Sequence, residues 1–167
     1  NFTKTITKYK IDHFHFPKFN KQYLNGVTIK ELLKHVKEKY VIITGDDDFI
    51  NIENLINFEY FLETNNDYSS CHGYGLHYNF STKIYFDKIQ THSYEENNPS
   101  ARIMELSKKY TVLQFSLTKV EDLRYAYEKI ENIFDPLLIE IFVILNLLVR
   151  GKSKNFNKLH IIRGFFK

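Results

Sequence analysis

The sequence predicts an α/β fold in which a mixed sheet is flanked by helices. Hydrophobic residues make up 43% of the 167 residues, which suffices for one core in a chain too short for two comfortable domains. Strand-like apolar runs alternate with segments of helical periodicity, as they do in α/β proteins. The run Tyr40–Ile43 suits a buried strand, and it leads through Gly45 into three adjacent carboxylates, Asp46, Asp47 and Asp48.

The charge, the cysteine count and the apolar runs of the sequence exclude several classes of protein. The net charge of +3 is spread along the chain without a basic block, so we expect no nucleic-acid partner. The single cysteine, Cys71, excludes an internal disulfide and fits a reducing compartment. The start of the sequence has no apolar leader, and its most apolar run, Pro136–Val149, is shorter than a membrane span. We therefore expect a cytoplasmic protein, in solution or at the inner face of the membrane, with no transmembrane segment.

The first elements predict a βαβ unit. Residues 10–17 alternate and stop at a proline, so they predict a strand that carries His13 and His15 on one face. Without a third ligand nearby, this pair is better explained as two polar strand residues than as a metal site. A capping-box spacing predicts a helix over 28–39, and the strand 40–43 follows at once. We expect the two strands to be parallel, with 40–43 inside the sheet and buried on both faces.

The remaining elements follow from periodicity and from their end signals. Asp135 and Pro136 suit the N-cap and first position of the most apolar helix, which ends at Gly151. Glycines such as Gly73, directly after a strand, allow a ligand or another backbone to approach closely. The sequence predicts helices over 51–64, 99–109, 119–133 and 136–150, strands over 68–72, 112–117 and 159–163, and a hairpin over 77–90.

The acidic run has two interpretations. Ligands of open α/β sheets bind beyond the carboxyl ends of the strands, where Asp46, Asp47 and Asp48 are expected. Three adjacent carboxylates repel one another unless a positive group lies between them, and Mg²⁺ or Mn²⁺ carrying a diphosphate is the obvious candidate. The alternative is a solvated acidic turn that caps the helix starting near Asn51. We favour the metal–diphosphate interpretation because the run follows a strand directly.

A second unusual carboxylate, Glu140, has apolar neighbours along the helix 136–150. An unpaired carboxylate buried there would cost several kcal/mol or stay protonated. Glu140 therefore either faces the wet side of the helix or pairs with Arg102 or Lys152, or it faces a cleft as a base or a ligand of hydroxyls. Asp135 suits the N-cap, and a carboxylate at a helix start can also serve as a general base.

The stretch 39–49, with its Tyr-Val pair and the run Asp-Asp-Asp-Phe, resembles the motif of bacterial family-2-like glycosyltransferases of the GT-A fold. The strand after the next helix, the Glu-bearing apolar helix ending at Arg150-Gly151-Lys152 and the closing strand with Arg163 agree with this resemblance. The likeness extends over about residues 10–165, although only the acidic run and the block from Asp135 to Lys152 are specific.

The resemblance implies a nucleotide-sugar-dependent transferase, with a nucleoside-diphosphate sugar as donor and a carbohydrate or other hydroxyl acceptor. Asp46 and Asp48 are the implied ligands of Mn²⁺ or Mg²⁺, and Asp46, Asp47 and Gly73 the implied donor-binding positions. Asp135 and Glu140 are the implied candidates for the base of an inverting reaction. The resemblance divides the single domain 1–167 into a donor- and metal-binding part, 10–75, and an acceptor-side part, 76–167.

The chain departs from the family pattern before the acidic run. About half of the family's usual length precedes that motif, so we expect the first strand and nucleobase loop to be missing and the domain to be N-terminally truncated. Two further hypotheses therefore stay open: a catalytically inactive fragment or binding module that retains the fold, and another Mg²⁺-dependent phosphoryl-transfer enzyme. The last is weak because no phosphate-binding glycine loop is present.

Overall fold

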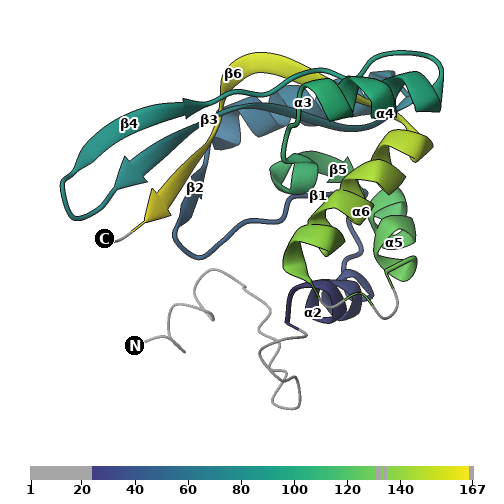
Figure 1. The fold of residues 1–167 in the computed structure, drawn as a ribbon, viewed down its shortest axis with the longest axis horizontal. Coiled ribbons are helices and arrows are strands. Elements are labelled where there is room, and N and C mark those ends of the chain that lie inside the picture. Colours follow the sequence, from purple (N-terminus) through teal and green to yellow (C-terminus); the bar gives the residue numbers. More distant parts are fainter. Residues whose placement is uncertain (1–23, 131–132, 134, 166–167) are drawn as a thin grey trace.

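The structure of this chain is a computed structural model that describes residues 24–130, 133 and 135–165. This part folds into a mixed sheet flanked by helices (Figure 1). The helices are α2 (Leu24–Leu33), α3 (Ile52–Thr64), α4 (Pro99–Lys108), α5 (Val120–Glu128) and α6 (Pro136–Arg150), with a 3₁₀ turn, η2 (Leu113–Phe115). The strands are β1 (Tyr40–Val41), β2 (Asp48–Ile50), β3 (Tyr68–Asn79), β4 (Ile84–Ile89), β5 (Leu117–Lys119) and β6 (Lys152–Phe165).

The two long strands, β3 and β6, form the middle of the sheet and are parallel to each other. The order is β1-β5-β3-β6-β2, and β4 pairs with the far half of β3. All other pairings are antiparallel. Figure 1 shows β3, β4 and the end of β6 extending as an arm away from α4, α5 and α6. The sheet therefore has a helix-covered part and a projecting part.

Three apolar clusters hold the helices to the sheet and to one another. In the first, Tyr127 of α5 and Val143 of α6 pack with the end of α2. In the second, Ile144 and Leu148 of α6 pack against α4 and η2. In the third, Phe58 and Leu62 of α3 cover Cys71 and Leu117 on the sheet. Helix α6 contributes to two clusters, which explains its long apolar sequence.

Several predictions from the sequence are confirmed. Helix α3 begins after Asn51, whose side chain accepts the Asn54 N–H at 3.3 Å, and α6 begins after Asp135, whose carboxylate accepts the Leu138 N–H at 3.0 Å. Helix α4, with Pro99 at its start, and the hairpin of β3 and β4 also lie where they were expected. The mixed sheet flanked by helices is confirmed as the fold class of the described part.

The prediction of a buried interior strand over Tyr40–Ile43 is wrong. Only Tyr40 and Val41 form a strand, and β1 lies at an edge of the described sheet, antiparallel to β5. Its residues are half-buried rather than covered on both faces. The predicted partner strand within 10–17, with His13 and His15, lies outside the described residues, so the parallel pairing stays a prediction.

Two other boundaries differ from expectation. Helix α2 spans Leu24–Leu33 rather than 28–39, because the Arg124 guanidinium donates to the carbonyls of Leu33 and Val36 and so stabilises an early end of the helix. The expected strand 112–117 is mostly the turn η2. Leu113 is fully buried there among α4 and α6, and the Ser116 N–H closes the turn onto the Leu113 carbonyl at 3.0 Å.

The strands β3 and β6 are longer than predicted, because β3 continues through Gly73 and Gly75. A Cβ placed on Gly73 would lie 1.9 Å from the Lys158 carbonyl oxygen. The glycine therefore lets the irregular part of β6 approach closely, and the neighbour that approaches is backbone. Among the described helices, none is both long and apolar enough to cross a membrane.

Candidate functional site

The acidic run forms a tight turn at the start of β2. Asp46 is exposed, Asp47 is half-buried, and the Asp48 side chain is 4% exposed. The Gly45 N–H donates to Asp48 Oδ2 at 3.1 Å. A Cβ on Gly45 would lie 2.9 Å from Asp47 Oδ1 and 3.1 Å from Asp48 Oδ2. The oxygens of two carboxylates therefore converge over Gly45, where the absence of a side chain leaves room for them.

Asp48 already faces a positive group of the chain itself. It lies opposite Arg163 in the antiparallel pair of β2 and β6, with Arg163 Nε 3.8 Å from Asp48 Oδ1. The Arg163 guanidinium also lies 4.4 Å from the centre of the Phe115 ring, a cation–π distance. The folded protein thus neutralises part of the charge for which the sequence suggested a metal.

The acidic run Asp46–Asp48 offers few ligands for a metal cation. In the described part of the chain, no three or more His, Cys, Asp or Glu side chains form a group that could hold a metal ion. Because only Asp47 and Asp48 converge over Gly45, a Mn²⁺ or Mg²⁺ ion at this turn would need phosphate oxygens or water to complete its oxygen shell.

The two carboxylates of α6 are separate from this turn. Asp135 caps the helix, and Glu140 accepts a hydrogen bond from the Tyr110 hydroxyl. Burial and the neighbouring carboxylate raise the pKa of Tyr110. Arg102 and Lys152, the partners considered from the sequence, bind elsewhere: Arg102 to backbone carbonyls and Lys152 to Asp67. Among the described residues, no hydrogen bond or ion pair joins Asp135 or Glu140 to Asp46, Asp47 or Asp48.

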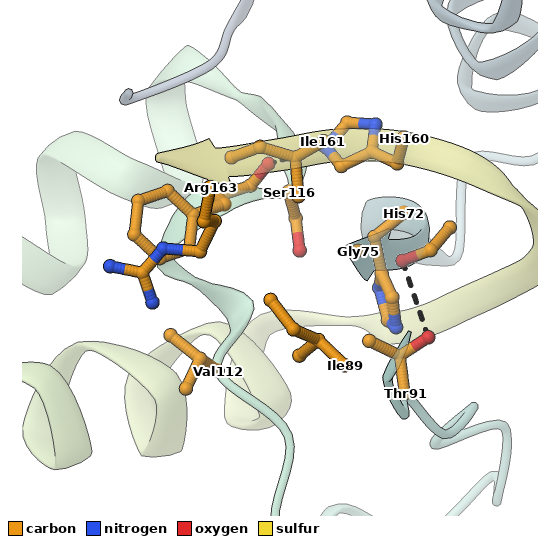
Figure 2. A pocket seen from close by; sticks show the side chains of 11 residues that line it. His72, Gly75, Ile89, Thr91, Val112, Ser116, His160, Ile161 and Arg163 are labelled. Atoms are coloured by element: carbon orange, nitrogen blue, oxygen red, sulfur yellow. Dashed lines mark hydrogen bonds between the residues drawn. The ribbon is translucent and has the colours of Figure 1, made fainter. Parts of the chain in front are cut away.

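A pocket opens next to Arg163, between β3, β6 and the η2 turn. Its cavity volume is about 40 Å³, which is room for a few water molecules. Figure 2 shows Ser116 and Ile89 around its centre, with Arg163 and His72 on opposite sides. Ile89, Val112 and Ile161 line it with apolar surface. Because Asp48 pairs with Arg163, the acidic turn and the pocket are joined through one side chain.

Four buried polar atoms, on residues that line this pocket, have no hydrogen-bond partner among the described residues. They are His72 Nε2, Ser116 Oγ, His160 Nδ1 and Arg163 Nε. His72, Ser116 and His160 are 3%, 1% and 1% exposed. Buried polar groups in native proteins nearly always have a partner, and water molecules in this space would supply it.

The imidazoles of His72 and His160 are neutral at physiological pH. Burial, followed by repulsion from His160, lowers the pKa of His72 to about 3, and burial lowers the pKa of His160. His160 Nε2 lies 2.6 Å from the Phe115 carbonyl oxygen, which can only accept a hydrogen bond. The proton therefore lies on Nε2, and Nδ1 is left as an acceptor.

These histidines predict a loss of stability in mild acid. Both folded pKa values lie below the unfolded value near 6.5, so the unfolded chain binds more protons as the pH falls through 6.5. His72 should lower the free energy of unfolding by about 1.4 kcal/mol between pH 7.5 and 5.5, and His160 should lower it further. Urea unfolding at the two pH values measures the loss. His72→Gln should remove the part of the loss that is due to His72, about 1.4 kcal/mol, and an unchanged pH dependence in that variant would contradict the assignment.

The histidines and Ser116 were not identified from the sequence. His72 follows Ser69, Ser70 and Cys71, and His160 lies between Leu159 and Ile161. A histidine next to strand residues that prove buried is the only local signal, and it does not reveal that two such strands are neighbours. Gly73, expected at a donor site, does line the pocket, and its close neighbour is the Lys158 backbone.

No known protein-family model matches this chain, and no curated protein sequence matches it.

Proposed function

We propose that this chain is a nucleotide-sugar-dependent glycosyltransferase domain of the GT-A type that binds its donor at the turn of Asp46, Asp47 and Asp48. The observation that carries the proposal is the convergence of Asp47 Oδ1 and Asp48 Oδ2 over Gly45, next to the exposed Asp46. Oxygen donors of this kind suit Mn²⁺ or Mg²⁺, and the diphosphate of the donor would supply further oxygens. A bound cation of this class stabilises negative charge on a departing diphosphate.

The chain's own residues would have distinct tasks in this reaction. Asp46 and Asp47 are the carboxylates that stay accessible, while Asp48, paired with Arg163, holds the turn against β6. Asp135 and Glu140 are both candidates for the base that takes the proton of the acceptor hydroxyl. Asp135 uses Oδ1 as the helix cap, and Glu140 accepts from Tyr110. A base must lie within hydrogen-bond reach of the acceptor, so comparing Asp135→Asn with Glu140→Gln in a transfer assay will separate them.

Calorimetry with UDP-glucose tests the proposal. In the presence of Mn²⁺ the wild-type protein should bind this donor, and Asp47→Asn should weaken the binding at least about tenfold, since a charged metal ligand becomes a neutral amide. Asp87→Asn, the same change at an exposed position of β4, serves as the matched control and should bind as the wild type does. Absence of Mn²⁺-dependent binding to any nucleoside-diphosphate sugar tested would overturn the proposal.

The ion pair of Asp48 with Arg163 favours a second candidate, a binding module that keeps the fold without catalysis. Arg163 supplies a positive group that needs no metal. This candidate expects the double variant Asp46→Asn, Asp47→Asn to retain all function and Mn²⁺ to have no effect on ligand binding.

A further inference from the structure

We propose that this chain forms a two-fold symmetric dimer in which the outward face of α6 packs antiparallel against the same face of a second copy. This inference concerns the assembly of the protein and does not rest on the proposed transferase activity. Figure 1 shows α6 at the end of the molecule opposite the arm of β3, β4 and β6. The proposed interface is therefore separate from the acidic turn, which lies at the start of β2.

The first argument is that α6 is apolar on all sides. Ile139, Val143 and Leu147 pack on α5 and α2, while Ile144 and Leu148 pack against α4 and η2. These contacts cover one side of the helix. A helix that packs on the core with one side normally carries polar and charged residues on the other, and a helix that is apolar all round is normally buried.

The side of α6 that faces away from the core carries an apolar stripe. Its members recur at intervals of four, three and four residues, which places them on one face of the helix: Leu138, Phe142, Leu145 and Val149. Leu138, Phe142 and Val149 are 50%, 43% and 48% exposed, and Leu145 is half-buried. Continuous exposed apolar surface of this kind marks an interaction site.

The second argument is that the spacing of the stripe is self-complementary. A two-fold axis between Phe142 and Leu145 sets Phe142 opposite the partner's Leu145 and Leu138 opposite the partner's Val149. Because the intervals are the same in both directions, every member of the stripe gains an apolar neighbour. Alternating intervals of four and three are also those of helices that pack side by side in coiled coils. A two-fold interface requires a surface that fits a copy of itself.

The third argument is charge complementarity. The two ends of α6 carry opposite charges, Asp135 at the N-cap and Arg150 at the last helical residue. Antiparallel packing sets each Asp135 beside the partner's Arg150, at the rim of the interface, whereas parallel packing would set like charges together. Asp135 uses Oδ1 for the helix cap, and Arg150 uses Nε for Asp122. The second carboxylate oxygen and the outer guanidinium nitrogens can form this pair.

The same charges favour a second copy over a membrane surface. A helix that lies on a membrane carries Lys or Arg along its polar flank, where these residues meet anionic lipids. The stripe of α6 is flanked instead by Ile141 and Asn146, which carry no charge. Its ends have one acidic and one basic residue, which suits a partner with the same pair in reverse order.

Sedimentation equilibrium of the full chain between about 1 and 100 μM tests the inference, and the wild type should be a dimer in this range. Phe142→Lys should raise the dissociation constant of the dimer at least about 30-fold, because it sets a charge in the apolar centre of the interface. Tyr60→Lys, the same kind of change at an exposed aromatic residue of α3, is the matched control and should leave the constant unchanged.

Asp135→Asn tests the charge argument without introducing bulk, because asparagine caps a helix as well as aspartate does. It should raise the dissociation constant about fivefold at low salt through the loss of two exposed ion pairs. The difference from the wild type should fade at high salt, where such pairs are screened. This variant decides the matter if Phe142→Lys does not fold.

Disulfide cross-linking tests the antiparallel arrangement. The native Cys71 is buried, so only introduced thiols should react. The double variant Leu138→Cys, Val149→Cys should join two copies on mild oxidation, and neither single variant should do so. The two positions are about 16 Å apart along one helix, which is too far for a disulfide within one chain.

Several results would overturn the proposal: a monomer at every concentration, an assembly larger than a dimer, a dimer that Phe142→Lys leaves intact, or cross-linking that differs from the expected pattern. A monomer that binds phosphatidylglycerol vesicles and loses this binding in Phe142→Lys would assign the face to a membrane instead. None of these measurements uses UDP-glucose or Mn²⁺, so such a failure leaves the test of the transferase intact.

Discussion

Replacing Gly73 with alanine will destabilise the protein by about 3 kcal/mol or more, because the new methyl group meets backbone. Its Cβ would lie 1.9 Å from the Lys158 carbonyl oxygen and 3.0 Å from the carbonyl carbon. The contact lies where the parallel register of β3 and β6 shifts, between His72 and Tyr74. Relief requires β6 to move away, and β3 and β6 are the central pair of the sheet. Chemical denaturation of purified wild type and variant measures the difference.

Gly26→Ala is the matched control for this substitution. A Cβ there would lie 3.0 Å from the Ile130 side chain and 3.1 Å from the Ile139 side chain, both of which end in flexible methyl groups. Alanine also favours the helix α2 over glycine by up to about 1 kcal/mol. Gly26→Ala should therefore change stability far less than Gly73→Ala. Equal effects of the two substitutions would contradict the close approach of β6 to β3.

Arg102→Met will lower the free energy of unfolding by about 3 to 5 kcal/mol through the loss of charged hydrogen bonds. Arg102 is 4% exposed, and its Nε donates to the Leu148 carbonyl at 2.8 Å. Its Nη1 donates to the carbonyls of Glu96 and Asn97 at 2.6 and 3.0 Å. The side chain thus joins the end of α6 to the loop before α4. Thermal unfolding with calorimetric detection checks the loss.

Arg102→Lys separates the charge of this residue from its geometry. Lysine keeps the positive charge, but it cannot reproduce the planar arrangement of donors that reaches four carbonyls at once. We expect it to recover only part of the stability lost in Arg102→Met. Full recovery would show that charge near the end of α6 matters more than the hydrogen bonds.

The sequence allowed the helices α3 and α6 to be predicted because their signals are local. Asn51 and Asp135 cap them, and apolar residues repeat at helical spacing after each cap. The role of Tyr40–Ile43 could not be predicted in the same way, since a strand's position in a sheet depends on partners elsewhere. Its partner in the described sheet is β5, far along the chain, and this pairing makes β1 an edge.

The candidate site, too, could be predicted only in part from the sequence. Three adjacent carboxylates are visible in the sequence, but the antiparallel pairing of β2 with β6 that sets Asp48 opposite Arg163 is not. The histidines of the pocket come together only because β3 and β6 are neighbours. Gly73 was recognised as a point of close approach, and the structure identifies the approaching group as the Lys158 backbone.

The proposal that the acidic turn binds a metal–nucleotide complex is most directly tested by paramagnetic NMR of the wild-type chain. Substoichiometric Mn²⁺ broadens the signals of amides close to the ion. With UDP-glucose present, Mn²⁺ should broaden the amide signals of Gly45, Asp46 and Asp47 first, and Mg²⁺ should compete the effect away. Amides of α4 (Pro99–Lys108), which Figure 1 shows on the far side of the molecule from β2, should stay sharp. Broadening that spares Gly45 to Asp47, or that is the same with and without UDP-glucose, would contradict the proposed function.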